Sequence, residues 1–286
     1  MRSVDIEFDS KRVLPGDTLS GRVVIKTDKA FDCNRVVLKA LSRERTEYGS
    51  GKHKSIDEKC HMTRVFRLSE SMTIEEGTTT IPFSFLLPRG LPPTYGQWSS
   101  FIKHTVEGVV EVDWALDPKS TEEFHVLQTR PPYLSEDAGV ETVPKSNEGL
   151  HVQLSNNILR MDSGILVRFK VDDEKRKRRV RFDIIRRQDT KCRWHETVSR
   201  RTMSEKDYDL GPDDWGRWKE MRIGEKWRFH LPFESTLIRV SYHLKVTYEI
   251  GLKLDPSIRI PLKFSDFSPD TEVLDDIALD LGLEDW

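Results

Sequence analysis

The residues of this chain that could do chemistry are mostly charged, and the densest group is a basic run in the second half. Clustered positive charge attracts phosphate groups and anionic lipid headgroups. Alternating apolar residues flank the run, so we expect it at the tip between two strands. The alternative is a solvated hairpin, balanced by the three acidic residues at positions 172–174. The run consists of Lys175, Arg176, Lys177, Arg178, Arg179 and Arg181.

Metal binding and catalysis find weaker support in the sequence. Cys192 and His195 are spaced like half of a zinc site, and Cys60 precedes a second histidine, His61. A structural zinc needs four ligands with tight spacing in both pairs, so we predict no metal and no other cofactor. No serine stands in a nucleophile elbow, and no glycine-rich loop precedes a helix. We interpret the acidic pair at 213–214 as a solvated turn and predict that the chain is not an enzyme.

The segment Pro92-Pro93-Thr94-Tyr95 has two interpretations. It matches the short proline motif that WW domains bind in an extended conformation. It is also an ordinary loop before a core strand. We predict the structural role for Pro92, Pro93 and Tyr95.

Alternating strands must position these residues. Over residues 238–250, apolar and polar side chains alternate without a break, which predicts a β-strand with one face in a core. Phe-x-Leu-Pro precedes this strand and Leu-Asp-Pro follows it, and residues 83–118 show a similar order. The sequence therefore predicts two copies of one all-β unit.

We predict two tandem antiparallel β-sandwiches at residues 1–128 and 150–264, joined by a proline-bearing linker at 129–149. The second sandwich should contain a long loop at 203–220. The last segment, 265–286, holds eight acidic residues and no Lys or Arg. Ser268-Pro269 suits a helix start, and an apolar stripe with helical spacing follows. We predict that this stripe docks on the chain's own basic body or on a partner; its members include Leu274, Ile277 and Leu281. The alternative is a frayed, solvated terminus.

Composition limits the partners and the compartment. The chain has 286 residues, of which 33% are charged, and no apolar run is long enough for a membrane helix. Neither a signal peptide nor a disulfide framework is apparent among its three cysteines, so we expect a cytoplasmic protein. Residues 151–264 carry a net charge of +9, with 26 basic and 17 acidic residues. No aromatic stacking platform accompanies this charge, so we predict no nucleic-acid partner.

Several motifs resemble those of arrestin-fold proteins. They are the Pro-Gly-Asp turn at 15–17 with Leu-Ser-Gly-Arg-Val-Val-Ile at 19–25, Ile-Pro-Phe-Ser-Phe-Leu-Leu-Pro at 81–88, and the strand at 238–250 with Arg-Ile-Pro-Leu at 259–262. The N-terminal motif looks most like the α-arrestins, which are trafficking adaptors. Residues 182–187, Phe-Asp-Ile-Ile-Arg-Arg, look like the arrestin-fold cargo subunit of retromer.

This resemblance implies a non-catalytic adaptor or signalling scaffold that binds cargo tails or sorting-complex subunits. An anionic surface of the endosomal or plasma membrane would be a second partner. The main alternative is a retromer-type subunit. A rival from another class is a carbohydrate-binding or hydrolytic β-sandwich. Signalling arrestins hold a buried charge cluster that includes a tail arginine, and residues 265–286 contain none.

Overall fold

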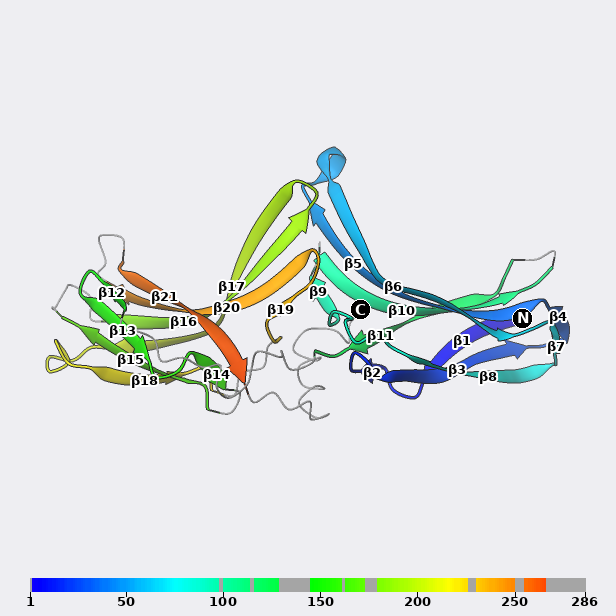
Figure 1. Ribbon diagram of the computed structural model, residues 1–286, viewed down its shortest axis with the longest axis horizontal. Coiled ribbons are helices and arrows are strands. Elements are labelled where there is room, and N and C mark those ends of the chain that lie inside the picture. Colours follow the sequence, from blue (N-terminus) through cyan, green and yellow to red (C-terminus); the bar gives the residue numbers. More distant parts are fainter. Residues whose placement is uncertain are drawn as a thin grey trace. The chain divides into compact units, whose positions relative to one another are not determined.

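The computed structural model describes residues 2–97, 100–113, 116–128, 145–160, 163–172, 179–225, 230–249 and 255–265. The chain forms two compact units. The first comprises residues 1–129 together with two short segments, Lys191–His195 and Ser235–Leu237, and the second comprises the remainder. Both units are built almost entirely of antiparallel strands, and the described residues contain no α-helix (Figure 1).

The first unit is a sandwich of two main sheets. One has the order β1-β3-β8, and the other has the order β2-β11-β10-β5-β6, with β9 paired to β10. A separate small sheet pairs β4 with β7. The strands are β1 (Arg2–Phe8), β2 (Arg12–Val13), β3 (Thr18–Thr27), β4 (Phe31–Cys33), β5 (Arg35–Tyr48), β6 (Ser55–Ser69), β7 (Met72–Ile74), β8 (Gly77–Leu86), β9 (Tyr95–Gln97), β10 (Ser100–Glu111) and β11 (Lys119–Val126), with one 3₁₀ turn at Gly51–His53.

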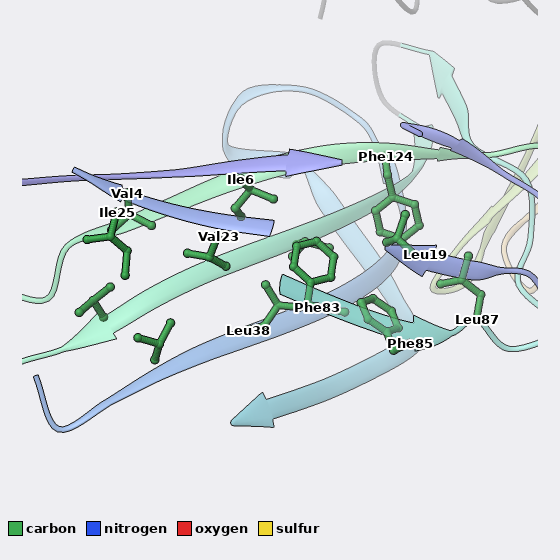
Figure 2. Packing of buried hydrophobic residues seen from close by; sticks show 14 of the residues in the cluster. Val4, Ile6, Leu19, Val23, Ile25, Leu38, Phe83, Phe85, Leu87 and Phe124 are labelled. Atoms are coloured by element: carbon green, nitrogen blue, oxygen red, sulfur yellow. The ribbon is translucent and has the colours of Figure 1, made fainter. Parts of the chain in front are cut away.

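Alternation along these strands builds the first core. Each strand turns every second side chain inward, so apolar residues from both sheets meet between them. Figure 2 shows Val4, Ile6, Val23 and Ile25 gathered together, with Phe83 among the aromatic side chains farther along the same core.

Two glycines fix the backbone at the start of this unit. Gly16 has φ +89° in the turn before β3, a conformation that L side chains rarely adopt. Gly21 lies where β1 and β8 approach β3 closely. A Cβ at this position would lie 2.3 Å from the carbonyl oxygen of Glu7. Gly16 belongs to the Pro-Gly-Asp motif and Gly21 to the Leu-Ser-Gly-Arg motif. The fold therefore explains why each motif contains glycine.

The second unit repeats this plan. One sheet has the order β12-β13-β15-β18, and the other has the order β14-β21-β20-β16-β17, with β19 paired to β20. The strands are β12 (Lys145–Asn147), β13 (Leu150–Leu154), β14 (Ile158–Arg160), β15 (Ile165–Val171), β16 (Arg179–Cys192), β17 (His195–Asp209), β18 (Lys219–Ile223), β19 (Phe233–Glu234), β20 (Ile238–Glu249) and β21 (Ser257–Ser265). Its core includes an edge-to-face contact between Phe169 and Phe182, whose ring centroids lie 5.1 Å apart.

Hydrogen bonds confirm that the two units are copies of one design. The larger sheet of each unit contains one parallel pair, β2 with β11 and β14 with β21. After the repeated Leu-Asp-Pro, the proline carbonyl accepts a 3.0 Å bond from the long strand. The donor is the Val110 amide in the first unit and the Tyr248 amide in the second. The predicted two-sandwich, all-β architecture is confirmed.

The structure differs from the sequence-based expectation in two segments. β12 forms inside the segment expected to be the linker, at Lys145–Asn147, whereas residues 129–144 lie outside the described part. The loop expected at 203–220 is wrong at both ends, because β17 continues to Asp209 and β18 begins at Lys219. Most β17 side chains are exposed on both faces, so its sequence lacks the alternation that identifies a half-buried strand.

Candidate functional site

A basic pocket of about 580 Å³ lies on the outward face of the larger sheet in the second unit. Strand alternation creates this face. On β20, Val240 and Tyr242 are buried, whereas Arg239, Ser241 and His243 point the other way. Cross-strand pairing then brings distant residues together, because directly opposed residues share a face. The five basic residues that line the pocket are Arg187, Arg200, Arg239, Arg259 and Lys263.

The register explains how strands β16, β20 and β21 contribute to one surface. Arg187 on β16 lies opposite Ser241 on β20, and His243 lies opposite Pro261 on β21. β17 follows β16 in the sheet and supplies Arg200. The five basic residues therefore come from four strands, with Arg259 and Lys263 both on β21, and the sheet places them around one hollow.

Positive charge dominates the pocket electrostatically. Glu234 is the acidic residue among those that line it, and it lies 3.6 Å from Arg239. Burial lowers the pKa of His243, and the charges of Arg259, Arg200 and Arg187 lower it further. His243 therefore stays neutral near physiological pH. The hollow combines guanidinium and ammonium groups with apolar walls, a chemistry suited to a carboxylate- or phosphate-bearing ligand.

The predicted basic run is only partly described. Residues 175–178 lie outside the described part of the chain. Arg179 and Arg181 begin β16, and carboxylates surround both side chains. Arg179 contacts Asp207 at 2.9 Å and Glu249 at 3.2 Å. Arg181 contacts Asp183 at 3.3 Å. The anion-binding role of the run stays a prediction, and these two arginines already have anionic partners within the fold.

Tyr95 of the WW-like motif is 1% exposed and begins β9. The preceding residue, Thr94, is fixed to β11 by two hydrogen bonds. The Thr94 amide donates to the Val126 carbonyl at 2.8 Å, and the Val126 amide donates to the Thr94 hydroxyl at 2.8 Å. Pro92 is also buried. A WW domain would have to displace this segment from the core to reach the tyrosine ring.

Comparison with known families adds a separate finding. Residues 4–130 match the family model described as Arrestin (or S-antigen), N-terminal domain. This range covers the first unit from β1 to β11. The first unit is therefore an arrestin-type N-terminal domain. Among curated proteins, no sequence matches the chain.

The second unit lies outside the matched range but repeats the topology of the first. Domains of the arrestin family are generally non-catalytic adaptors that bind proteins. Within the described part of the chain, no helix has the length and apolarity needed to cross a bilayer.

Sequence reasoning missed a buried carboxylate in the first unit. Glu44 on β5 is 0% exposed and has hydrogen-bond partners on β6 and in the short segment between β19 and β20. The Leu237 amide donates at 3.0 Å and the Ser235 hydroxyl at 2.9 Å, while His61 Nε2 lies 2.9 Å away. A fully buried acid needs such partners, because an unpaired charge is strongly destabilising. Residues 42–47 around Glu44 are all polar, so the local sequence gives no signal that Glu44 is buried.

The other candidates from the sequence are accounted for by local contacts. Cys60 Sγ lies 2.9 Å from the Thr63 hydroxyl. Asp214 contacts Lys219 at 2.5 Å, and this contact lowers the Asp214 pKa. Among the described residues, no three His, Cys, Asp or Glu side chains gather where they could hold a metal ion. The predicted docking residues Leu274, Ile277 and Leu281 lie outside the described residues.

Proposed function

We propose that this arrestin-fold protein is a non-catalytic adaptor in protein trafficking that binds partner segments by strand addition. The observation that carries the proposal is β17, a strand of 15 residues at the edge of its sheet. Within the described part of the second unit, β17 has one sheet neighbour, β16. An edge strand presents unpaired backbone N–H and C=O groups, which an extended peptide can pair with.

The charged side chains of β17 would make binding at this edge selective. Arg200, Arg201 and Lys206 lie along the strand with several acidic residues. Charged side chains on an edge strand discourage association between identical copies. They also allow a partner of complementary charge to be selected. The equivalent edge strand of the first unit, β6, also has 15 residues and offers a second surface of the same kind.

Within the arrestin fold, we favour an α-arrestin-like adaptor over a retromer-type subunit. The retromer-like residues at 182–187 occupy a central strand, where Phe182 is 1% and Asp183 is 3% exposed. The resemblance of this segment to the retromer subunit is therefore explained by core packing, which any arrestin fold requires, and it does not favour the retromer-type alternative. A stable purified monomer supports the adaptor, and an obligate partner supports the retromer-type alternative. We place the protein in the cytoplasm, with the basic run contacting anionic endosomal or plasma membrane.

The experiment is site-specific photo-cross-linking in the native cell. A photo-reactive residue at Val198, which is 42% exposed on β17, should link to the protein that co-purifies with the chain. The matched control places the same group at Arg22, an exposed position on the central strand β3. Equal labelling at both positions, or none at Val198 while the partner still co-purifies, would sink the proposal of strand addition at β17.

A further inference from the structure

A serine, a histidine and an aspartate are linked by hydrogen bonds on the outward face of the sheet β12-β13-β15-β18. The hydroxyl of Ser146 lies 2.6 Å from Nδ1 of His151, and Nε2 of His151 lies 2.6 Å from a carboxylate oxygen of Asp172. A hydroxyl, an imidazole and a carboxylate in this order form the arrangement that activates a serine as a nucleophile. We call these three residues the serine relay. It lies on a different sheet from the basic pocket.

Strand pairing brings the three side chains of the serine relay together. Ser146 on β12 lies directly opposite His151 on β13, and His151 lies opposite Lys170 on β15. Asp172 follows Lys170 by two residues, so both side chains point to the same face of the sheet. The Asp172 amide donates a 2.9 Å hydrogen bond to the Gly149 carbonyl, which holds Asp172 beside the turn between β12 and β13.

The hydrogen-bonding partners of His151 determine where its ring carries the proton. The contact with Lys170, at 2.8 Å, and then the bond from His151 lower the pKa of Asp172, so this carboxylate is ionised at neutral pH. An ionised carboxylate only accepts hydrogen bonds, so Nε2 of His151 donates to it. In the neutral ring, Nδ1 then has a free lone pair, to which the Ser146 hydroxyl donates. The relay therefore holds the tautomer that can accept the serine proton.

A second group with the same residue types, in the first unit, lacks this order. The Ser235 hydroxyl donates to Oε2 of Glu44 at 2.9 Å, and His61 Nε2 lies 2.9 Å from the same oxygen. The distance from the Ser235 hydroxyl to His61 is 3.5 Å. The proton of Ser235 is therefore directed to the acid, whereas the proton of Ser146 is directed to an imidazole. Of these two serines, only Ser146 has a base positioned to remove its proton.

The surroundings of the serine relay are open and include an aromatic ring. Ser146 is exposed to solvent, so a small substrate can reach its hydroxyl. The ring of Trp218 is 39% exposed, and its centroid lies 6.5 Å from that of His151. The guanidinium of Arg168 lies over the other ring contact of this tryptophan, 5.6 Å from its centroid. The indole offers an apolar surface for the acyl group of a substrate.

We propose that Ser146 is a covalent acceptor site for acyl groups carried by activated esters such as thioesters. The Ser146 oxygen attacks the carbonyl carbon of the ester while its proton passes to Nδ1 of His151. The bond from this carbon to the leaving sulfur or oxygen then breaks, and the leaving group takes the proton from His151. The product is an acyl ester of Ser146, and Asp172 is a positioning residue.

This modification goes beyond the adaptor function and does not depend on it. The serine relay lies on β12, β13 and the end of β15, whereas the proposed strand addition uses β17 on the other sheet. The acyl group stays on the chain, so the site modifies the protein itself. Either proposal can therefore fail while the other holds.

The test is acetylation of the full chain by p-nitrophenyl acetate, followed by mass spectrometry of its peptides. Ser146 should be acetylated at least about a hundredfold faster than Ser199, an exposed serine on β17 outside the relay. His151→Ala should remove this advantage, and added imidazole should restore it relative to Ser199, because imidazole supplies the missing base. The matched control, Ser199→Ala, should leave the rate at Ser146 unchanged.

Substitutions of Asp172 test its positioning role. Asp172→Asn should slow acetylation of Ser146, because an amide can donate to Nε2 and leave the proton on Nδ1. Asp172→Glu keeps the carboxylate and should retain more of the rate than Asp172→Asn. Asp172 is exposed, so both variants should melt close to the temperature of the unmodified chain. If both react at the unmodified rate, Asp172 does not position His151.

Two results would overturn the proposal as a whole. One is acetylation of Ser146 no faster than that of Ser199 in the unmodified chain. The other is an unchanged rate at Ser146 in His151→Ala without imidazole, since the serine would then react without the relay.

Discussion

Replacing His104 with phenylalanine should make the first unit less sensitive to acid. His104 lies on β10, is 1% exposed, and packs 5.5 Å from Phe124 between ring centroids. Burial, with a smaller contribution from nearby His61, holds the pKa of His104 at about 3, well below its ordinary 6.5. The folded protein therefore keeps this imidazole neutral, whereas the unfolded chain protonates it as the pH falls below 6.5.

The sign and magnitude of the effect follow from this difference. Since the folded pKa lies below the unfolded one, the unfolded state binds more protons between pH 6.5 and pH 3. The free energy of unfolding is therefore unaffected by His104 above pH 6.5 and falls as the pH decreases through that window. A pKa difference of one unit corresponds to about 1.4 kcal/mol, so His104 should cost about 2 kcal/mol at pH 5 relative to pH 8.

The assay is urea unfolding of the full chain at pH 8 and pH 5, with the transition of the first unit followed by exchange of β10 amides. The packing change in His104→Phe is the same at both pH values, so it cancels in the difference between them. Other histidines, including His230 with a pKa of about 4, remain in both proteins and also cancel. The control variant His53→Gln changes an exposed histidine.

The wild-type chain should lose about 2 kcal/mol more than His104→Phe between pH 8 and pH 5. His53→Gln should behave like the wild type. If the wild type and His104→Phe lose the same free energy, the neutral buried imidazole does not explain any part of the acid response, and the reasoning is refuted.

Three further substitutions test the structural and functional assignments. Gly21→Ala should lower the free energy of unfolding by about 2–4 kcal/mol, because the new Cβ would meet a carbonyl oxygen of β1. The control is Gly90→Ala, where the new Cβ has open space, so the free energy of unfolding should fall by less than about 1 kcal/mol. Thermal unfolding measures both. Glu44→Ala leaves its buried donors unpaired and should cost about 2–4 kcal/mol in urea unfolding, a result that an unchanged midpoint would contradict. Replacing residues 175–179 with serine should abolish sedimentation with anionic liposomes, since each base near such a surface contributes about 1 kcal/mol; unchanged sedimentation excludes the run as the lipid site.

Sequence patterns predicted the strands that have one buried face. Along most of β20 and β10, every second residue is buried, because one face of each strand borders a core. The same alternation, with the repeated Leu-Asp-Pro, predicted the duplicated sandwich. β17 was not predicted as a strand, and its residues 203–209 were assigned to a loop, for the opposite reason. When both faces of a strand are exposed, hydrophobic burial imposes no period on the sequence, and only backbone pairing with β16 defines the strand.

The buried acid was missed because burial of a single polar residue depends on partners that are distant in sequence. Glu44 is followed 191 positions later by Ser235, whose hydroxyl donates to it. Nothing in the local pattern around either residue distinguishes this pair from two exposed polar side chains. Identifying the buried pair requires the tertiary fold, because the hydrogen bond between the two groups offsets the cost of desolvating them.

The location of positive charge shows why local density in a sequence is a poor guide to an anion site. Residues 175–181 form the densest basic run, yet the arginines described there, Arg179 and Arg181, lie beside carboxylates from β16, β17 and β20. The pocket, in contrast, is lined by basic residues from separate strands, such as Arg200 on β17 and Arg259 on β21. A ligand responds to the sum of nearby charges and to their desolvation, and both depend on cross-strand register. An isolated arginine whose sheet neighbours are basic can therefore attract an anion more strongly than one in a basic run whose sheet neighbours are acidic.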